Sequence, residues 1–252
     1  MSPRRRPPST MWACRRALVF LVALAWRAPA QTSPHWPSPS AVQLIAVGPA
    51  GYEKTQECSG TALWLDAQGD LLTNAHVVEL AQRCLEGRRK AQLLVKFSNS
   101  SAPEATAIPC RVTELDKRRD LALLRADWSP GFKPPWPRWD ENPLPRGTRL
   151  RVAGFPASSW QPVIQTGFVI GYQFERLLRG RPDATQMLVM KVSLRRGSSG
   201  SPVYLADGRL VGLVEARLSH DPTEALIIPA RYIANFLRRS AVVHGTPTSH
   251  SR

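Results

Sequence analysis

Residues 196–204 read Arg-Gly-Ser-Ser-Gly-Ser-Pro-Val-Tyr, a run of small residues that leads directly into an apolar segment. A nucleophilic serine needs backbone that can approach a substrate carbonyl, and neighbours without bulky side chains leave room for amide donors to face a developing negative charge. Ser199, which lies between Gly197 and Gly200, meets this requirement. The alternative is a flexible glycine and serine loop of the kind found in linkers. Because the stretch lies between two strand-like segments, we favour an ordered turn that presents a serine.

Short apolar runs separated by turn residues extend outward from this stretch in both directions. They cover residues 42–47, 60–65, 71–73, 92–97, 110–115, 121–125, 149–153, 163–172, 187–193, 202–205, 209–215 and 225–228. Their lengths and spacing are typical of strands. A helical pattern occurs only in a turn or two at 77–83 and at 230–239. The chain is therefore expected to consist mostly of β-structure.

A proline-rich stretch divides these runs into two halves. Residues 129–147 contain six prolines, each of which lacks the backbone donor that a central strand needs. We interpret this stretch as a linker or a long crossing loop. The sequence thus predicts β-rich halves at about 41–128 and 148–228, a helix at 230–239 and a flexible tail at 240–252.

Two polar residues of the first half stand at the ends of apolar runs. His76 follows residues 71–73 beside small residues, where its imidazole is free to project into a cleft. Asp120 precedes residues 121–125, where a partly buried carboxylate can hold the ring N–H of a histidine. Each also has an ordinary explanation, as a structural histidine and as a solvated turn carboxylate, and Asp116 fits the second description equally well. Neither residue is a specific signal by itself.

The order His76, Asp120, Ser199 across two β-rich halves resembles the chymotrypsin-like peptidases, in particular the branch that includes the HtrA (Deg) proteases and the bacterial glutamyl endopeptidases. The resemblance lies in residues 60–78, 119–125 and 197–214 and spans roughly residues 41–239. It implies an all-β fold of two antiparallel six-stranded barrels with a C-terminal helix. It also implies a trypsin-like serine endopeptidase that hydrolyses protein substrates through an acyl-enzyme intermediate and needs no cofactor.

The same resemblance assigns roles to individual residues. His76, Asp120 and Ser199 would form the catalytic triad, and the amides of Gly197 and Ser199 would form the oxyanion hole. The substrate pocket would be lined by Ser193, Val214, Glu215, Ala216 and Arg217. No metal site is expected, because the histidines outside the triad lack the spacing of a zinc-binding helix.

The sequence departs from the family pattern at several positions. Ser198 stands where the family usually has Asn or Asp, so any loop contact of that side chain is missing. Glu215 and Arg217 would either alter substrate choice or face solvent. The uncharged Ser193 argues against a strict preference for Lys or Arg. A preference for acidic side chains through Arg217 or His220 is an alternative, and the sequence leaves the side-chain preference open. The chain ends soon after its last helix, so we expect no PDZ module of the kind that HtrA proteins carry.

Residues 1–30 have the pattern of a cleavable signal peptide. Basic residues precede an apolar run at 17–26, and small residues stand at positions 28 and 30. A membrane anchor is the alternative, but the run is much shorter than the ~20 residues that span a bilayer as a helix. We therefore expect a secreted or periplasmic protein without stable membrane insertion after signal removal. Cys58, Cys84 and Cys110 then remain for one disulfide, whose pairing the sequence leaves open, with Cys58 and Cys84 as a candidate pair.

Beyond residue 30 the chain has 28 basic and 19 acidic residues, a formal net charge of +9. Basic clusters at 88–90 and 195–196 could mark a phosphate-binding surface, but no nucleic-acid motif accompanies them, so no specific nucleic-acid partner is expected. A catalytically silent, peptide-binding or chaperone-like protein of the same fold is the main alternative. The complete triad argues against it. The expected partners are protein or peptide substrates, and the oligomeric state is not predicted.

Overall fold

The computed structural model describes residues 41–47, 59–85, 92–96, 107–127, 137–156, 162–175, 185–217 and 221–240. All of them belong to the larger of the chain's two units, residues 34–252. Several predictions fall outside the described residues: the signal peptide at 1–30, Cys58, the first part of the proline-rich crossing and the tail beyond Ser240.

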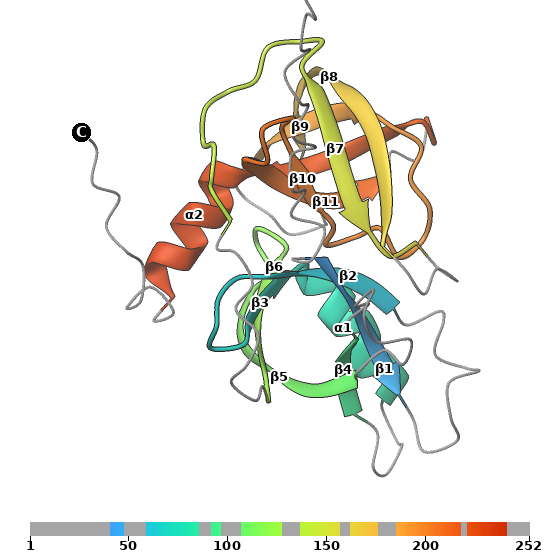
Figure 1. Ribbon diagram of the computed structural model, residues 1–252, viewed down its shortest axis with the longest axis vertical. Coiled ribbons are helices and arrows are strands. Elements are labelled where there is room, and N and C mark those ends of the chain that lie inside the picture. The colour runs from blue at the N-terminus through green and yellow to red at the C-terminus, as the bar shows by residue number, and fades with distance from the viewer. Residues whose placement is uncertain are drawn as a thin grey trace, which may run out of the picture. The chain divides into compact units, whose positions relative to one another are not determined.

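The first half of the chain forms a closed antiparallel barrel with the strand order β1-β2-β3-β6-β5-β4 (Figure 1). Its strands are β1 (Ala41–Val47), β2 (Ser59–Trp64), β3 (Asp70–Thr73), β4 (Gln92–Lys96), β5 (Ala107–Asp116) and β6 (Leu121–Ala126). Pairing of β1 with β4 closes the sheet on itself. Closure satisfies the backbone groups that an open sheet would leave unpaired at its edges.

The second half forms another closed antiparallel barrel, with the order β10-β11-β12-β9-β8-β7. Its strands are β7 (Arg149–Gly154), β8 (Val163–Glu175), β9 (Thr185–Lys191), β10 (Pro202–Tyr204), β11 (Leu210–Arg217) and β12 (Glu224–Pro229). The helix α2 (Ala230–Arg239) follows directly and agrees with the predicted bounds. The expected all-β fold of two six-stranded barrels with a C-terminal helix is therefore confirmed.

The helix α1 (Ala75–Leu85) is longer than the predicted turn or two at 77–83. It begins before His76, because the backbone N–H of His76 finds an acceptor in the carboxylate of Asp120 from a distant segment. Such N–H groups in the first turn have no partner within the helix itself. Val77, Val78 and Ala81 bury one face of the helix in the core of the first barrel.

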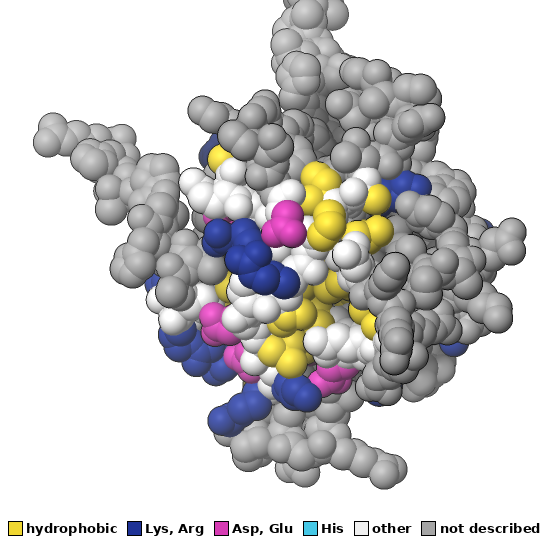
Figure 2. Space-filling model, turned by 90° about the horizontal axis from the view of Figure 1, so that it is seen from below, with side chains coloured by type: hydrophobic (Ala, Val, Ile, Leu, Met, Phe, Trp, Pro, Cys, Tyr) yellow, Lys and Arg dark blue, Asp and Glu magenta, His cyan; other side chains and the backbone are white. Residues whose placement is uncertain are grey.

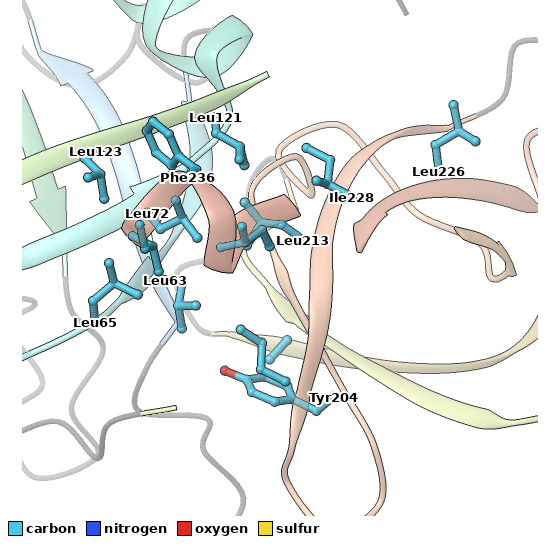
Figure 3. Close-up of a cluster of buried hydrophobic side chains, with 14 of the residues drawn as sticks. Leu63, Leu65, Leu72, Leu121, Leu123, Tyr204, Leu213, Leu226, Ile228 and Phe236 are labelled. Carbon is cyan, nitrogen blue, oxygen red and sulfur yellow. The ribbon is translucent and has the colours of Figure 1, made fainter. Parts of the chain in front are cut away.

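A shared apolar core joins the two barrels and α2. Figure 3 shows side chains from both halves of the chain in one cluster, within which every labelled residue is buried. The labelled residues are Leu63, Leu65, Leu72, Leu121, Leu123, Tyr204, Leu213, Leu226, Ile228 and Phe236. Removing apolar surface from water stabilises the folded state by about 25 cal/mol per Å². This contact holds segments from the two barrels side by side.

Basic and acidic side chains lie next to each other on the face that Figure 2 shows. Arg125 of β6 binds both carboxylate oxygens of Asp70 on β3, whose side chain is 3% exposed. Arg209, which directly precedes β11, pairs with Asp140 of the proline-rich crossing. In the described part of the chain, no helix is long and apolar enough to cross a membrane. No group of three or more His, Cys, Asp or Glu among those residues is arranged as a metal site.

Candidate active site

Asp120 holds His76 through two hydrogen bonds. The backbone N–H of His76 donates to Oδ1 over 2.9 Å, and ring Nδ1 lies 2.7 Å from Oδ2. A carboxylate only accepts hydrogen bonds, so Nδ1 carries the proton and Nε2 of the neutral ring has a free lone pair. The side chain of Asp120 is 1% exposed and that of His76 is 36% exposed. The pair thus has a buried carboxylate and a solvent-accessible base.

The backbone of Asp120 is in the left-handed region, with φ at +57°. This conformation costs a residue other than glycine about 1–2 kcal/mol and needs surrounding contacts to hold it. Asn74 supplies one, because its side-chain amide donates to the carbonyl of Asp120 over 3.2 Å. The two bonds to His76 supply the others. The segment that carries His76 therefore holds the backbone and the side chain of Asp120 in place.

The pKa of His76 lies above its usual value as the balance of opposing effects. Burial disfavours the charged imidazolium and lowers the pKa, but the hydrogen bond and negative charge of Asp120 raise it, with further contributions from the charges of Glu215 and Glu79. The negative charges around the ring outweigh its burial. Such a histidine readily accepts a proton near neutral pH.

Ser199 lies in the second of two consecutive tight turns between β9 and β10. Ser198 N–H donates to Arg195 O over 3.1 Å, and Ser201 N–H donates to Ser198 O over 3.0 Å. The third residues of these turns are Gly197 and Gly200, with φ of +87° and +82°. A positive φ at this position is typical of type II turns, which favour glycine there. The glycines flanking the serines therefore shape an ordered turn and not a flexible linker.

The hydroxyl of Ser199 donates to the backbone carbonyl of Glu215 over 3.1 Å. Among the described residues it forms no hydrogen bond with His76. The structure therefore brings His76 and Asp120 into contact, while Ser199 must release Glu215 O before its hydroxyl can donate to Nε2.

The amides of Gly197 and Ser199 donate to no acceptor among the described residues, whereas the amides of Ser198, Gly200 and Ser201 are all engaged. Two backbone donors beside the Ser199 hydroxyl thus remain available to a ligand. Donors in such a position can stabilise negative charge on an oxygen atom.

The residues predicted to line the pocket have different environments. Ser193 is exposed, and its carbonyl accepts a bond from the side chain of Gln165. Val214 packs its side chain into the core of the second barrel, and its backbone bonds Gly200 and Ser201. Glu215 is 5% exposed and lies at a β-bulge of β11. Ala216 and Arg217 continue β11.

Sequence reasoning assigned no role to Thr61, a fully buried residue of β2. Its N–H donates to Ser199 O and its hydroxyl to Gly197 O, each over 2.9 Å. A polar residue inside an apolar strand signals a buried hydrogen bond. The partner of that bond could not be read from the sequence, because it lies 136 positions away. The same holds for Asn74, whose contact with Asp120 was not predicted.

Comparisons with known proteins show the family and the fold of the chain. The family model described as the trypsin-like peptidase domain matches residues 58–213. Uncharacterized protein y4bJ of Sinorhizobium fredii is 26% identical, over 85% of this chain and 31% of its own length. A serine protease HtrA-like protein of Staphylococcus aureus is 26% identical, over 73% of this chain and 24% of its own length. The chain therefore spans only 24% to 31% of these relatives.

A solved structure shares the fold. The active form of the Rv3671c protease from M. tuberculosis superposes with a TM-score of 0.63 at 20% sequence identity. The match covers 80% of this chain and 81% of the other. The two-barrel architecture is thus one that proteins of low sequence identity have in common.

Proposed function

Because the chain belongs to the trypsin-like peptidase family, we propose that it is a secreted serine endopeptidase with His76, Asp120 and Ser199 as its catalytic triad. One observation carries the proposal: His76 Nδ1 lies 2.7 Å from a carboxylate that is almost completely buried. A buried carboxylate in this position fixes the tautomer of the ring and stabilises the imidazolium that forms when the histidine acts as a base. Protein and peptide chains are the substrates that the family implies.

The mechanism begins when Ser199 leaves the carbonyl of Glu215. Its hydroxyl proton passes to Nε2 of His76 while Oγ attacks the carbonyl carbon of a peptide bond. The carboxylate of Asp120 stabilises the imidazolium that forms, because both bonds of Asp120 to His76 are already in place. The result is a tetrahedral intermediate with its negative charge on the former carbonyl oxygen.

The amides of Gly197 and Ser199 would receive that oxygen as an oxyanion hole, each typically worth about 3 kcal/mol. Nε2 of His76 then donates its proton to the leaving amine, and an acyl-enzyme on Ser199 remains. Water attacks this ester with His76 again acting as the base. The carboxylic acid product departs and Ser199 regains its proton.

The pocket proposal rests on the residues beside this turn. Glu215 and Val214 lie next to the turn. The carbonyl of Glu215 accepts a hydrogen bond from the Ser199 hydroxyl, and the backbone of Val214 forms hydrogen bonds with other residues of the turn. Substrate backbone would pair along β11, where Ala216 and Arg217 follow. The uncharged Ser193 would leave the pocket without a fixed counter-charge for Lys or Arg side chains.

A catalytically silent, peptide-binding protein of the same fold is the second candidate. It is favoured by the Ser199 hydroxyl, which donates to Glu215 O instead of His76. In that case the cleft would hold chains without cleaving them. The two functions differ in whether Ser199 is an activated nucleophile.

Export and a disulfide complete the proposal. Residues 1–30 would be removed as a signal peptide, which places Cys58, Cys84 and Cys110 in an oxidising compartment. Of the described cysteines, Cys110 has a free thiol and Cys84 does not. Burial raises the pKa of Cys110 to about 12 and keeps it in the unreactive thiol form. These observations support a bridge between Cys84 and Cys58.

Labelling with a fluorophosphonate probe tests the proposed activity. The purified protein should react at Ser199, and neither Ser199→Ala nor His76→Ala should react at a comparable rate. Folding of each variant is checked by circular dichroism. Labelling that survives Ser199→Ala would show that another residue is the nucleophile. A folded wild-type protein that never reacts would support the silent peptide-binding function.

The same preparation tests export and the disulfide. Its N-terminal sequence should begin at Gln31. Alkylation of the unfolded protein in denaturant should modify a single cysteine, Cys110, before reduction and all three remaining cysteines after reduction. Modification of Cys84 without reduction would rule out the bridge.

A further inference from the structure

The turn that carries Ser199 is held by contacts from outside the turn as well as by its own backbone hydrogen bonds. Thr61 of the first barrel contacts it twice: Thr61 N–H donates to Ser199 O, and Thr61 Oγ1 donates to Gly197 O. Thr61 thus binds two carbonyls of the turn, those of Gly197 and Ser199.

The hydroxyl of Thr61 is held from the other side as well. Oγ1 accepts a bond from the N–H of Phe155, just beyond β7, over 3.0 Å. The carbonyl of Thr61 accepts a bond from Thr73 Oγ1 over 2.7 Å. Thr61 and Thr73 are fully buried. Hydrogen bonds to groups from both halves of the chain therefore fix the position of Thr61 Oγ1.

The backbone of the turn lies directly against Thr61. A Cβ atom added to Gly200 would stand 1.9 Å from Thr61 O, and Gly200 already has a φ of +82°. Only glycine allows this approach. The contact between β2 and the turn is thus a close fit between backbones as well as a pair of hydrogen bonds.

These bonds restrict the peptide groups around Ser199. The carbonyls of Gly197 and Ser199 are held by Thr61, and the carbonyl of Ser198 accepts a bond from Ser201 N–H. Three consecutive peptide planes therefore have fixed directions. The N–H of Ser199 belongs to the middle plane and is one of the two donors without a described acceptor.

We propose that Thr61 is a positioning residue, which uses its hydroxyl to hold the Ser199 turn in the orientation that presents the oxyanion donors. The inference rests on the proposed peptidase function. Donor geometry then depends on the packing of the two barrels against each other.

Thr61→Val tests this role, because valine keeps the shape of threonine and removes only the hydroxyl. Displacement of about 1 Å can cost up to 100-fold in rate, so the rate constant of fluorophosphonate labelling should fall between about tenfold and 100-fold. Thr61→Ser retains the hydroxyl and should stay within about threefold of wild type. The pH at which labelling reaches half its maximum should not move, since Thr61 contacts neither His76 nor Asp120 directly.

Val95→Ala serves as the stability control, because Val95 lies in the core of the first barrel on β4. It should lower the unfolding temperature and leave the labelling rate unchanged. If Thr61→Val does not fold, Thr61→Ala takes its place, since it removes the same hydroxyl with less steric change to its neighbours. A folded variant without the hydroxyl that reacts at the wild-type rate would overturn the inference and leave the peptidase proposal standing. A wild-type protein that does not react would overturn both.

Discussion

Replacing Asp120 with Asn should nearly abolish catalysis while preserving the fold. Asn is the informative change because it tolerates the left-handed backbone that Asp120 adopts, whereas most other residues would add strain. The carboxylate accepts from two donors of His76, its backbone N–H at Oδ1 and its ring at Oδ2. An amide has one oxygen and one NH₂ group, so it can accept only one of these bonds.

The magnitude follows from the tautomer. If the amide oxygen stays with the backbone N–H of His76, the NH₂ group faces Nδ1 and requires a lone pair there. The ring proton then moves to Nε2, which can no longer accept the proton of Ser199. Loss of the correct tautomer in such a triad lowers kcat by ~10⁴-fold, equivalent to about 5.5 kcal/mol of transition-state stabilisation.

The assay is the rate of fluorophosphonate labelling at saturating probe, with peptide hydrolysis as a second measure once a substrate is known. Asp116→Asn is the matched control, because Asp116 pairs with Arg119 in the same loop and has no contact with His76. It should retain activity within about twofold, because an Asn oxygen can still accept the bond that Arg119 N–H donates to Asp116 Oδ1. A loss of less than about tenfold in Asp120→Asn, or equal losses in both variants, would refute the assigned role of Asp120.

Two further predictions concern electrostatics. Glu215→Gln removes a negative charge that raises the pKa of His76. The rise of the labelling rate with pH should therefore move to lower pH. A move to higher pH would contradict this effect of Glu215 on His76. Asp70→Asn breaks the ion pair with Arg125, in which the Asp70 side chain is buried. Urea denaturation should show a free energy of unfolding that is lower by about 2–3 kcal/mol. The pH dependence of labelling should not change.

Local sequence patterns predicted the architecture well. Alternating short apolar runs and turn residues determined the strands of both barrels, and the apolar face of residues 230–239 gave α2 its correct bounds. Strand length, helix periodicity and turn chemistry depend on residues close together in the chain. Gly197 and Gly200 were interpreted correctly as parts of an ordered turn for the same reason, since a positive φ is a local requirement.

The contacts of the candidate site depended on the tertiary structure. The early start of α1 depends on an acceptor 44 positions away, and the hydroxyl of Ser199 donates to the carbonyl of Glu215 on β11. Thr61 was an ordinary strand residue in the sequence, yet it meets Gly197 across 136 positions. The sequence alone determined which segments become strands and turns, because those choices depend on neighbouring residues. Which buried donor finds which acceptor was decided only when both barrels closed and packed, because a hydrogen bond requires its two atoms within about 3 Å of each other.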